Sequence, residues 1–147
     1  MVLPPLALYI HIPWCVKKCP YCDFNSHAVR DEIPERAYID ALLHDMSIET
    51  HAAQGRQIDT VFIGGGTPSL FSSGAISEIL SAVDKQVPFA HDVEITIEAN
   101  PGTFESQRFA GFKAAGVNRL SIGVQSFNDK HLAALGRIHS ATEAIKA

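Results

Sequence analysis

Three cysteines, Cys15, Cys19 and Cys22, lie within eight residues of one another with the spacing C-x₃-C-x₂-C. They are the only three cysteines in a chain of 147 residues, and an odd, tightly clustered set is a poor disulfide framework. Three thiolates from one loop can bind three irons of a cubane [4Fe–4S] cluster and leave the fourth iron without a protein ligand. A cofactor or substrate needs such an open metal position in order to bind.

A closed zinc site is the main alternative for the cysteines. The three thiolates could form a tetrahedral Cys₃His site with His11 or His27, and both zinc and iron–sulfur clusters favour thiolate ligands. A purely structural [4Fe–4S] cluster would usually have four cysteines. A reactive thiol is less favoured, because the sequence fixes no base in position against any one cysteine. The cysteines alone leave the choice between cluster and zinc open.

The residue pattern predicts strands that alternate with helices and so position the cysteine loop. A first strand is expected at residues 6–12, directly before the loop, and a helix is expected to begin at Pro34. Further strands are predicted at residues 60–63, 93–98 and 120–124, and further helices around residues 76–83, 104–112 and 132–135. Such βα units imply a parallel sheet, which is either part of a barrel or an open doubly wound sheet.

Residues that could bind a ligand follow each of the later strands. Residues 64–67, Gly-Gly-Gly-Thr, could let a ligand approach the backbone closely, although a tight turn also explains them. Glu98 and Gln125 end the third and fourth strands, and a strand-end carboxylate can accept hydrogen bonds from ribose hydroxyls. Arg137 could pair with a carboxylate, or simply be a solvated helix-end residue. Because parallel strands end on one side of a sheet, we expect one composite site there.

Composition and charge exclude several classes of protein. The chain is 46% hydrophobic and 19% charged, which is ordinary for a globular protein with a real core. A formal charge of −4 argues against a basic nucleic-acid-binding surface. No run of 18 apolar residues predicts a membrane span, and Pro4-Pro5 interrupts the short apolar start, so no signal peptide is expected. These features predict a cytoplasmic protein.

The segment Tyr9-Ile10-His11-Ile12-Pro13-Trp14-Cys15, followed by the other two cysteines, resembles the radical-SAM superfamily. More narrowly, the whole chain is similar to the oxygen-independent coproporphyrinogen III oxidase family and its HemW-type heme chaperone branch. The resemblance implies an α/β fold that forms the N-terminal part of a partial TIM-type (β/α)6 radical-SAM barrel, with about four βα units present. Residues 1–147 would then be one radical-SAM core domain that is incomplete at its C-terminus.

The resemblance also implies the residues that hold the cofactors. Cys15, Cys19 and Cys22 match the ligands of a [4Fe–4S] cluster whose open iron binds S-adenosyl-L-methionine. Positions that match cofactor contacts are Tyr9, Tyr21, Gly65, Gly66, Thr67, Glu98, Gln125 and Arg137. In the superfamily, the reduced cluster cleaves S-adenosylmethionine and the adenosyl radical abstracts hydrogen from a substrate. The cofactor carries that chemistry, and the protein supplies position and exclusion of water.

Two features separate the branches of the family. The oxidases continue the cysteine motif as C-x₃-C-x₂-C-x-C, whereas this chain has Phe24 at the last position, and only fourteen residues precede Cys15. Both features favour a heme chaperone that delivers heme to acceptor proteins. The alternative is the oxidase, which decarboxylates coproporphyrinogen III to protoporphyrinogen IX, and a structural zinc-binding domain is a weak third. Heme or a porphyrinogen, a heme-acceptor protein and an electron donor are the expected partners.

The C-terminal end of the sequence predicts a longer protein. Ser140 and Glu143 have the spacing of a capping box, which opens a helix, and the chain stops at Ala147 before two turns are complete. The resemblance implies that heme is a ligand of the full-length protein and that its binding motif lies outside this sequence.

Overall fold

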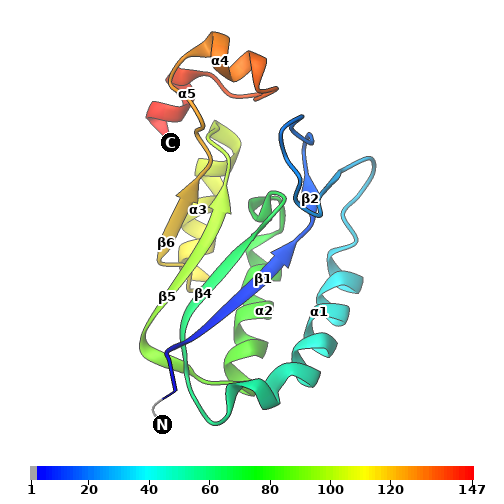
Figure 1. Cartoon of the computed structure of the whole chain (residues 1–147), viewed down its shortest axis with the longest axis vertical. Coiled ribbons are helices and arrows are strands. Elements are labelled where there is room, and N and C mark those ends of the chain that lie inside the picture. Colours follow the sequence, from blue (N-terminus) through cyan, green and yellow to red (C-terminus); the bar gives the residue numbers. More distant parts are fainter. Residues whose placement is uncertain (1–2) are drawn as a thin grey trace.

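The structure is a computed structural model that describes residues 3–147, apart from the side chains of residues 103–107. Four parallel strands form the main sheet in the order β1-β4-β5-β6 (Figure 1). Their bounds are β1 Leu6–Ile12, β4 Ile58–Gly65, β5 Phe89–Ala99 and β6 Arg119–Ile122. The helices are α1 Glu35–Glu49, α2 Ser73–Gln86, α3 Thr103–Ala114, α4 Asp129–Ala134 and α5 Ala141–Lys146, with 3₁₀ turns at Thr50–Ala53 and Pro68–Leu70.

The four strands follow one another across the sheet in chain order. A doubly wound sheet reverses its strand order at a switch point, and this sheet contains no reversal in the part that the structure describes. Right-handed crossovers without reversal keep every helix on one face, as in a barrel. Figure 1 shows α1, α2 and α3 side by side along the sheet, with α2 in contact with both of its neighbours. The architecture is therefore barrel-like rather than doubly wound.

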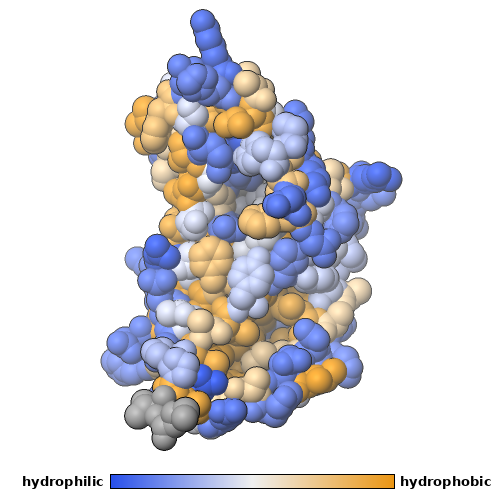
Figure 2. Space-filling model, in the orientation of Figure 1, coloured by the Kyte–Doolittle hydropathy of each residue, from blue (hydrophilic) through white to orange (hydrophobic). Residues whose placement is uncertain are grey.

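Alternation along the strands sorts side chains between a helix-covered face and an uncovered face. The covered face is apolar and forms the core with α1, α2 and α3. Its fully buried members include Ile12, Ile63, Ile97, Ile76, Ile79 and Phe112. On the uncovered face, Tyr9 stacks on Phe62 with ring centroids 6.2 Å apart. Figure 2, in the same orientation, shows apolar surface next to polar surface over the strands.

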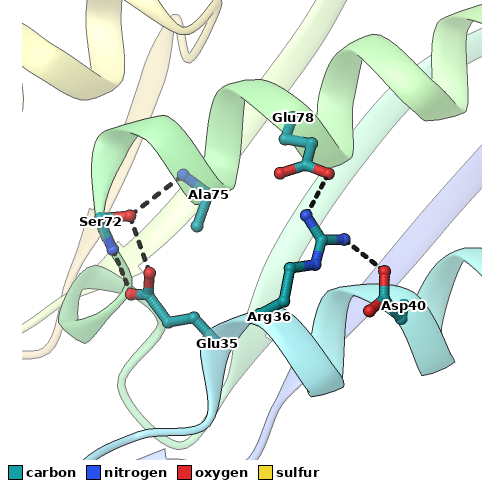
Figure 3. A network of polar contacts seen from close by, with 6 residues as sticks. All are labelled: Glu35, Arg36, Asp40, Ser72, Ala75 and Glu78. Carbon is teal, nitrogen blue, oxygen red and sulfur yellow. Dashed lines mark hydrogen bonds and ion pairs between the residues drawn. The ribbon is translucent and has the colours of Figure 1, made fainter.

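A polar contact between helices fixes α2 relative to α1 (Figure 3). Ser72 is the N-cap of α2, and its Oγ accepts a hydrogen bond from the backbone N–H of Ala75 at 3.1 Å. The carboxylate of Glu35, at the start of α1, accepts hydrogen bonds from the Ser72 backbone N–H (2.6 Å) and from Ser72 Oγ (2.8 Å). Arg36 adds an ion pair to Glu78 of α2 at the surface. The first two βα units are thereby joined through the cap of one helix.

The structure confirms the predicted elements and extends several of them. β1 has the predicted bounds, whereas β4 and β5 are longer than predicted and β6 ends at Ile122. The predicted capping box at Ser140 is present and begins α5. A short parallel pair, β2 Trp14–Cys15 and β3 His27–Ala28, was not predicted and places Cys15 in a strand rather than a loop. The side chain of Phe104, the first residue of the helix predicted around residues 104–112, lies outside the described residues.

Candidate functional site

The cysteine segment leaves the sheet at the C-terminal end of β1. Cys15 is buried in β2, where it pairs with Ala28 of β3, and Cys19 and Cys22 are half-buried in the turn that follows. The backbone N–H of Cys22 donates to the carbonyl oxygen of Cys19 at 3.1 Å, which curls the turn. All three thiols are free. They are therefore available as metal ligands on one short, structured segment.

Contacts from both sides fasten this segment. Lys18 donates from Nζ to the carbonyl oxygens of Phe24 and Ser26, both at 3.2 Å. His11 at the end of β1 binds the carbonyl oxygen of Asn25 through Nε2 at 2.8 Å. Ser26 is buried, and its Oγ lies 3.9 Å from Cys22 Sγ. The loop around the cysteines is thus held in shape by protein contacts.

The arrangement does not favour a zinc site. Among the residues that the structure describes, no three His, Cys, Asp or Glu side chains converge as ligands of one metal ion. Both ring nitrogens of His11 are engaged, by the Tyr9 hydroxyl (3.1 Å) and by the Asn25 carbonyl oxygen (2.8 Å), and His27 lies exposed on β3. In a cubane cluster each thiolate binds a different iron, so the sulfurs need not converge on one point. The donor set fits a cluster better than a single ion.

The glycine-rich segment after β4 packs against the cysteine segment. The backbone N–H of Gly65 donates to Glu98 Oε2 (3.0 Å), that of Gly66 to the Ile12 carbonyl oxygen (2.8 Å) and that of Thr67 to the Trp14 carbonyl oxygen (2.7 Å). A Cβ on Gly66 would lie 2.5 Å from the Trp14 carbonyl oxygen. The glycine is therefore required by protein packing, and the N–H donors of Gly65, Gly66 and Thr67 are engaged within the protein. The segment can offer a ligand carbonyl oxygens, which are acceptors.

A cavity of about 440 Å³ lies at the C-terminal ends of β4, β5 and β6. Its volume is in the range of small-molecule sites. A second, smaller cavity of about 60 Å³ reaches Cys15 and shares four lining residues with the first: Gly66, Thr67, Asn100 and Arg137. Predicted site residues that line the larger cavity are Cys22, Gly65, Gly66, Thr67, Glu98, Gln125 and Arg137. The strand ends and Cys22 thus border one cavity, and a neighbouring cavity that shares part of its wall reaches Cys15.

Arg137, which follows α4, lines both cavities. Its Nη2 donates to Asn100 Oδ1 at 2.6 Å and to the carbonyl oxygen of Gly123 at 2.7 Å. Its Nη1 lies 3.6 Å from Cys19 Sγ. Its Nε is buried and has no hydrogen-bond partner among the described residues. A buried N–H of a charged group without a partner is costly unless a ligand supplies an acceptor.

Gln125 and Glu98 present polar groups to the same cavity. Gln125 lies three residues beyond the end of β6 in the left-handed region, with φ of 62°, which costs a non-glycine residue free energy. Glu98 on β5 uses Oε2 for the Gly65 N–H, and its Oε1 has no partner among the described residues. Oε1 is therefore the oxygen that could accept hydrogen bonds from a ligand.

The two predicted tyrosines lie outside the lining of the cavity. Tyr9 is 55% exposed on the uncovered face of the sheet, and burial followed by the charge of Glu98 raises its pKa. Tyr21 is 49% exposed, and its pKa is raised first by burial and then by a hydrogen bond with Cys19. That bond places Tyr21 at the cysteines. The cofactor contacts of both tyrosines remain predictions.

Three residues that shape the site were not predicted from the sequence. Asn100 lines both cavities and contacts Arg137, and its position directly after the strand that carries Glu98 was the available signal. Lys18 holds the cysteine loop in shape, and only its place inside the cysteine motif could have indicated this role. His139 is 6% exposed and donates from Nε2 to the Val124 carbonyl oxygen at 3.0 Å, which supports the turn before Gln125. Burial lowers the pKa of His139.

Comparison with known proteins identifies the family. The model of the radical SAM superfamily matches residues 9–147. The chain belongs to the radical SAM superfamily. The predicted membership and the predicted α/β radical-SAM architecture are thereby confirmed. Within residues 3–147, no helix is long and apolar enough to cross a bilayer.

Individual relatives include heme chaperones and an oxidase. The heme chaperone HemW of Escherichia coli is 58% identical over 145 residues, which are 99% of this chain and 38% of that protein. HemW of Haemophilus influenzae is 56% identical, over 99% of this chain and 39% of that protein. The solved coproporphyrinogen III oxidase HemN of Escherichia coli, a radical SAM enzyme, superposes with a TM-score of 0.85 at 32% identity, covering 97% of this chain and 33% of that one. The chain thus spans less than two fifths of the length of these relatives.

Proposed function

We propose that this chain is the cofactor-binding part of a HemW-type heme chaperone, with a [4Fe–4S] cluster on Cys15, Cys19 and Cys22. The observation that carries the proposal is the position of Arg137: it lines the cavity of the strand-end residues and Cys22, it lines the smaller cavity that reaches Cys15, and it contacts Cys19 Sγ. Superfamily membership implies the cluster and S-adenosylmethionine as cofactors. That residues 1–147 form one radical-SAM core domain, incomplete at its C-terminus and located in the cytoplasm, is part of the same proposal.

The chain's own residues suit each polar group of S-adenosylmethionine. The partnerless Nε of Arg137 supplies a donor for the carboxylate. Carbonyl oxygens of Gly65 and Gly66 suit the ammonium group, because the N–H donors of these residues are already bonded within the protein and the carbonyls are acceptors. Oε1 of Glu98 suits ribose hydroxyls, and the Gln125 amide lines the same cavity. When bound, S-adenosylmethionine supplies a sulfonium that a reduced cluster can cleave, and the protein orients it away from water.

Phe24 favours the chaperone over the oxidase. It occupies the position of the fourth cysteine of the oxidase motif, lines the cavity and is 57% exposed. The HemW relatives are also more similar, at 58% identity against 32% for the oxidase HemN. Heme delivered to an acceptor protein, with a separate electron donor, is the activity we propose for the whole protein. Oxidation of coproporphyrinogen III remains the second candidate because the oxidase shares the fold.

Anaerobic reconstitution with iron and sulfide tests the cofactor proposal. The reduced protein is expected to give a [4Fe–4S]⁺ EPR signal that shifts when S-adenosylmethionine is added. Each of the variants Cys15→Ala, Cys19→Ala and Cys22→Ala is expected to lose the signal, because each removes one ligand. A folded protein that binds zinc and no cluster would disprove the proposal.

A second assay separates the two activities. Heme titration of the whole protein, followed by absorbance, is expected to show tight binding, while coproporphyrinogen III incubated with that protein, reductant and S-adenosylmethionine is expected to stay unchanged. Turnover of coproporphyrinogen III would establish the oxidase instead.

A further inference from the structure

We propose that Asn100 is a positioning residue that holds the guanidinium of Arg137 in place for S-adenosylmethionine, an inference that rests on the proposed function. Asn100 directly follows β5 and lines both cavities. Its Oδ1 accepts the shortest hydrogen bond that Arg137 makes, at 2.6 Å. Its Nδ2 donates to Thr67 Oγ1 at 3.2 Å. One side chain thus connects the segment after β4 with the arginine that reaches the cysteines.

The chemistry of the partners fixes which way the Asn100 amide points. A guanidinium carries only donors, so the end of the amide that faces Arg137 must be the oxygen. The opposite end then carries two N–H donors, and Thr67 Oγ1 supplies an acceptor for one of them. Thr67 is 4% exposed, so its hydroxyl is held by packing. The buried threonine therefore orients Asn100, and Asn100 orients Arg137.

The position of Arg137 depends on acceptors that surround its two terminal nitrogens. Nη2 is shared between Asn100 and the Gly123 carbonyl, while Nη1 contacts Cys19 Sγ. Together these three contacts define the plane of the guanidinium, and therefore the direction in which the partnerless Nε–H points. Loss of the Asn100 oxygen leaves two contacts, one of them to a weakly accepting sulfur. A misdirected Nε–H would bind the carboxylate of S-adenosylmethionine less tightly.

Three single variants of the reconstituted protein separate positioning from folding. Asn100→Ala removes the hydrogen bonds to Arg137 and Thr67, whereas Asn100→Asp keeps an acceptor for Arg137 and can accept from the Thr67 hydroxyl. Asn118→Ala is the matched control, because Asn118 also makes two hydrogen bonds, to the Ile95 N–H and the Val93 carbonyl (both 2.8 Å), away from the cavity. Each protein is analysed for iron and sulfide, melted thermally, and titrated with S-adenosylmethionine by EPR.

We expect Asn100→Ala to retain wild-type iron and to need about tenfold more S-adenosylmethionine for half of the EPR shift. Asn100→Asp should restore most of that affinity, and Asn118→Ala should lower the melting temperature without changing the titration. Wild-type affinity in Asn100→Ala, or an equal loss in Asn118→Ala, would overturn the inference. If wild-type protein itself showed a cluster that ignores S-adenosylmethionine, the proposed function would fail rather than the role of Asn100.

A double-mutant cycle tests whether Asn100 acts through Arg137. In the Arg137→Gln background, the further change Asn100→Ala should cost nothing more in affinity, because the group that it positions is already gone. Additive losses in the double variant would show that Asn100 contributes independently of Arg137, and the positioning role would be wrong.

Discussion

Nη1 of Arg137 lies 3.6 Å from Sγ of Cys19, a residue 118 positions earlier in the chain. The arginine follows α4, and the cysteine belongs to the segment that follows β1. Hydrogen bonds and positive charge at a cysteine sulfur stabilise the reduced, more negative state of an iron–sulfur cluster. In the proposed holoprotein, Arg137 therefore acts on the reduction potential as well as on S-adenosylmethionine.

Replacing Arg137 with glutamine is expected to lower the midpoint potential of the cluster. Loss of a charged N–H···S contact worth roughly 1.4 kcal/mol corresponds to about 60 mV for a one-electron couple. A redox titration monitored by EPR, without S-adenosylmethionine, measures this shift. Arg30→Gln is the control, because this variant removes the same charge from an exposed side chain rather than from a contact with Cys19. Equal potentials for Arg137→Gln and wild type would contradict the role of the contact.

The left-handed conformation of Gln125 should lower the stability of the fold while it positions the side chain to bind S-adenosylmethionine. Replacing Gln125 by glycine removes the steric strain of a positive φ, worth about 1–2 kcal/mol, against a cost of about 0.5–1 kcal/mol for the added backbone freedom. Urea unfolding should therefore show unchanged or slightly higher stability, while the affinity for S-adenosylmethionine falls. Gln54, with φ of 52° at a distant 3₁₀ end, offers the matched control Gln54→Gly. That variant should share the stability change and keep full affinity.

His139 should make the stability of the protein depend on pH. Burial holds its folded-state pKa below the ordinary value of 6.5, so the unfolded chain binds more protons between those two values. The contribution of His139 is therefore complete above pH 6.5 and declines as the pH falls toward the folded-state pKa. Urea unfolding at a series of pH values should show a shallower decline for His139→Gln than for wild type. His131→Gln should match wild type, because His131 is exposed.

The junction between α1 and α2 should depend on the capping contact rather than on the surface ion pair. Ser72→Ala removes the N-cap of α2 and is expected to cost about 1 kcal/mol, and Glu35→Ala a similar amount. Glu78→Gln breaks an ion pair between exposed side chains and should cost less than about 0.5 kcal/mol. Denaturant unfolding of the three variants measures the difference. A larger loss for Glu78→Gln than for Ser72→Ala would reverse this assignment.

Local pattern was enough to predict much of the framework. The bounds of β1, the capping box at Ser140 and the spacing of the three cysteines all follow from residues close together in the chain. Side-chain periodicity and capping chemistry act over a few residues, so a sequence carries them directly. The rule that parallel strands end on one side of a sheet also predicted that the glycine segment, Glu98 and Gln125 would lie together, and all of them line one cavity.

Only the tertiary structure decided which hydrogen bonds connect the residues of the site. The N–H groups of the glycine segment donate to Glu98 and to residues just before the cysteines, and Asn100 connects Thr67 to Arg137. This arrangement depends on distances between separate strand ends. So does the choice of a barrel over a doubly wound sheet, which rests on strand order. Residue types state which hydrogen bonds are possible. Only the packing of distant segments determines which of them form, because each donor and acceptor can satisfy few partners at once.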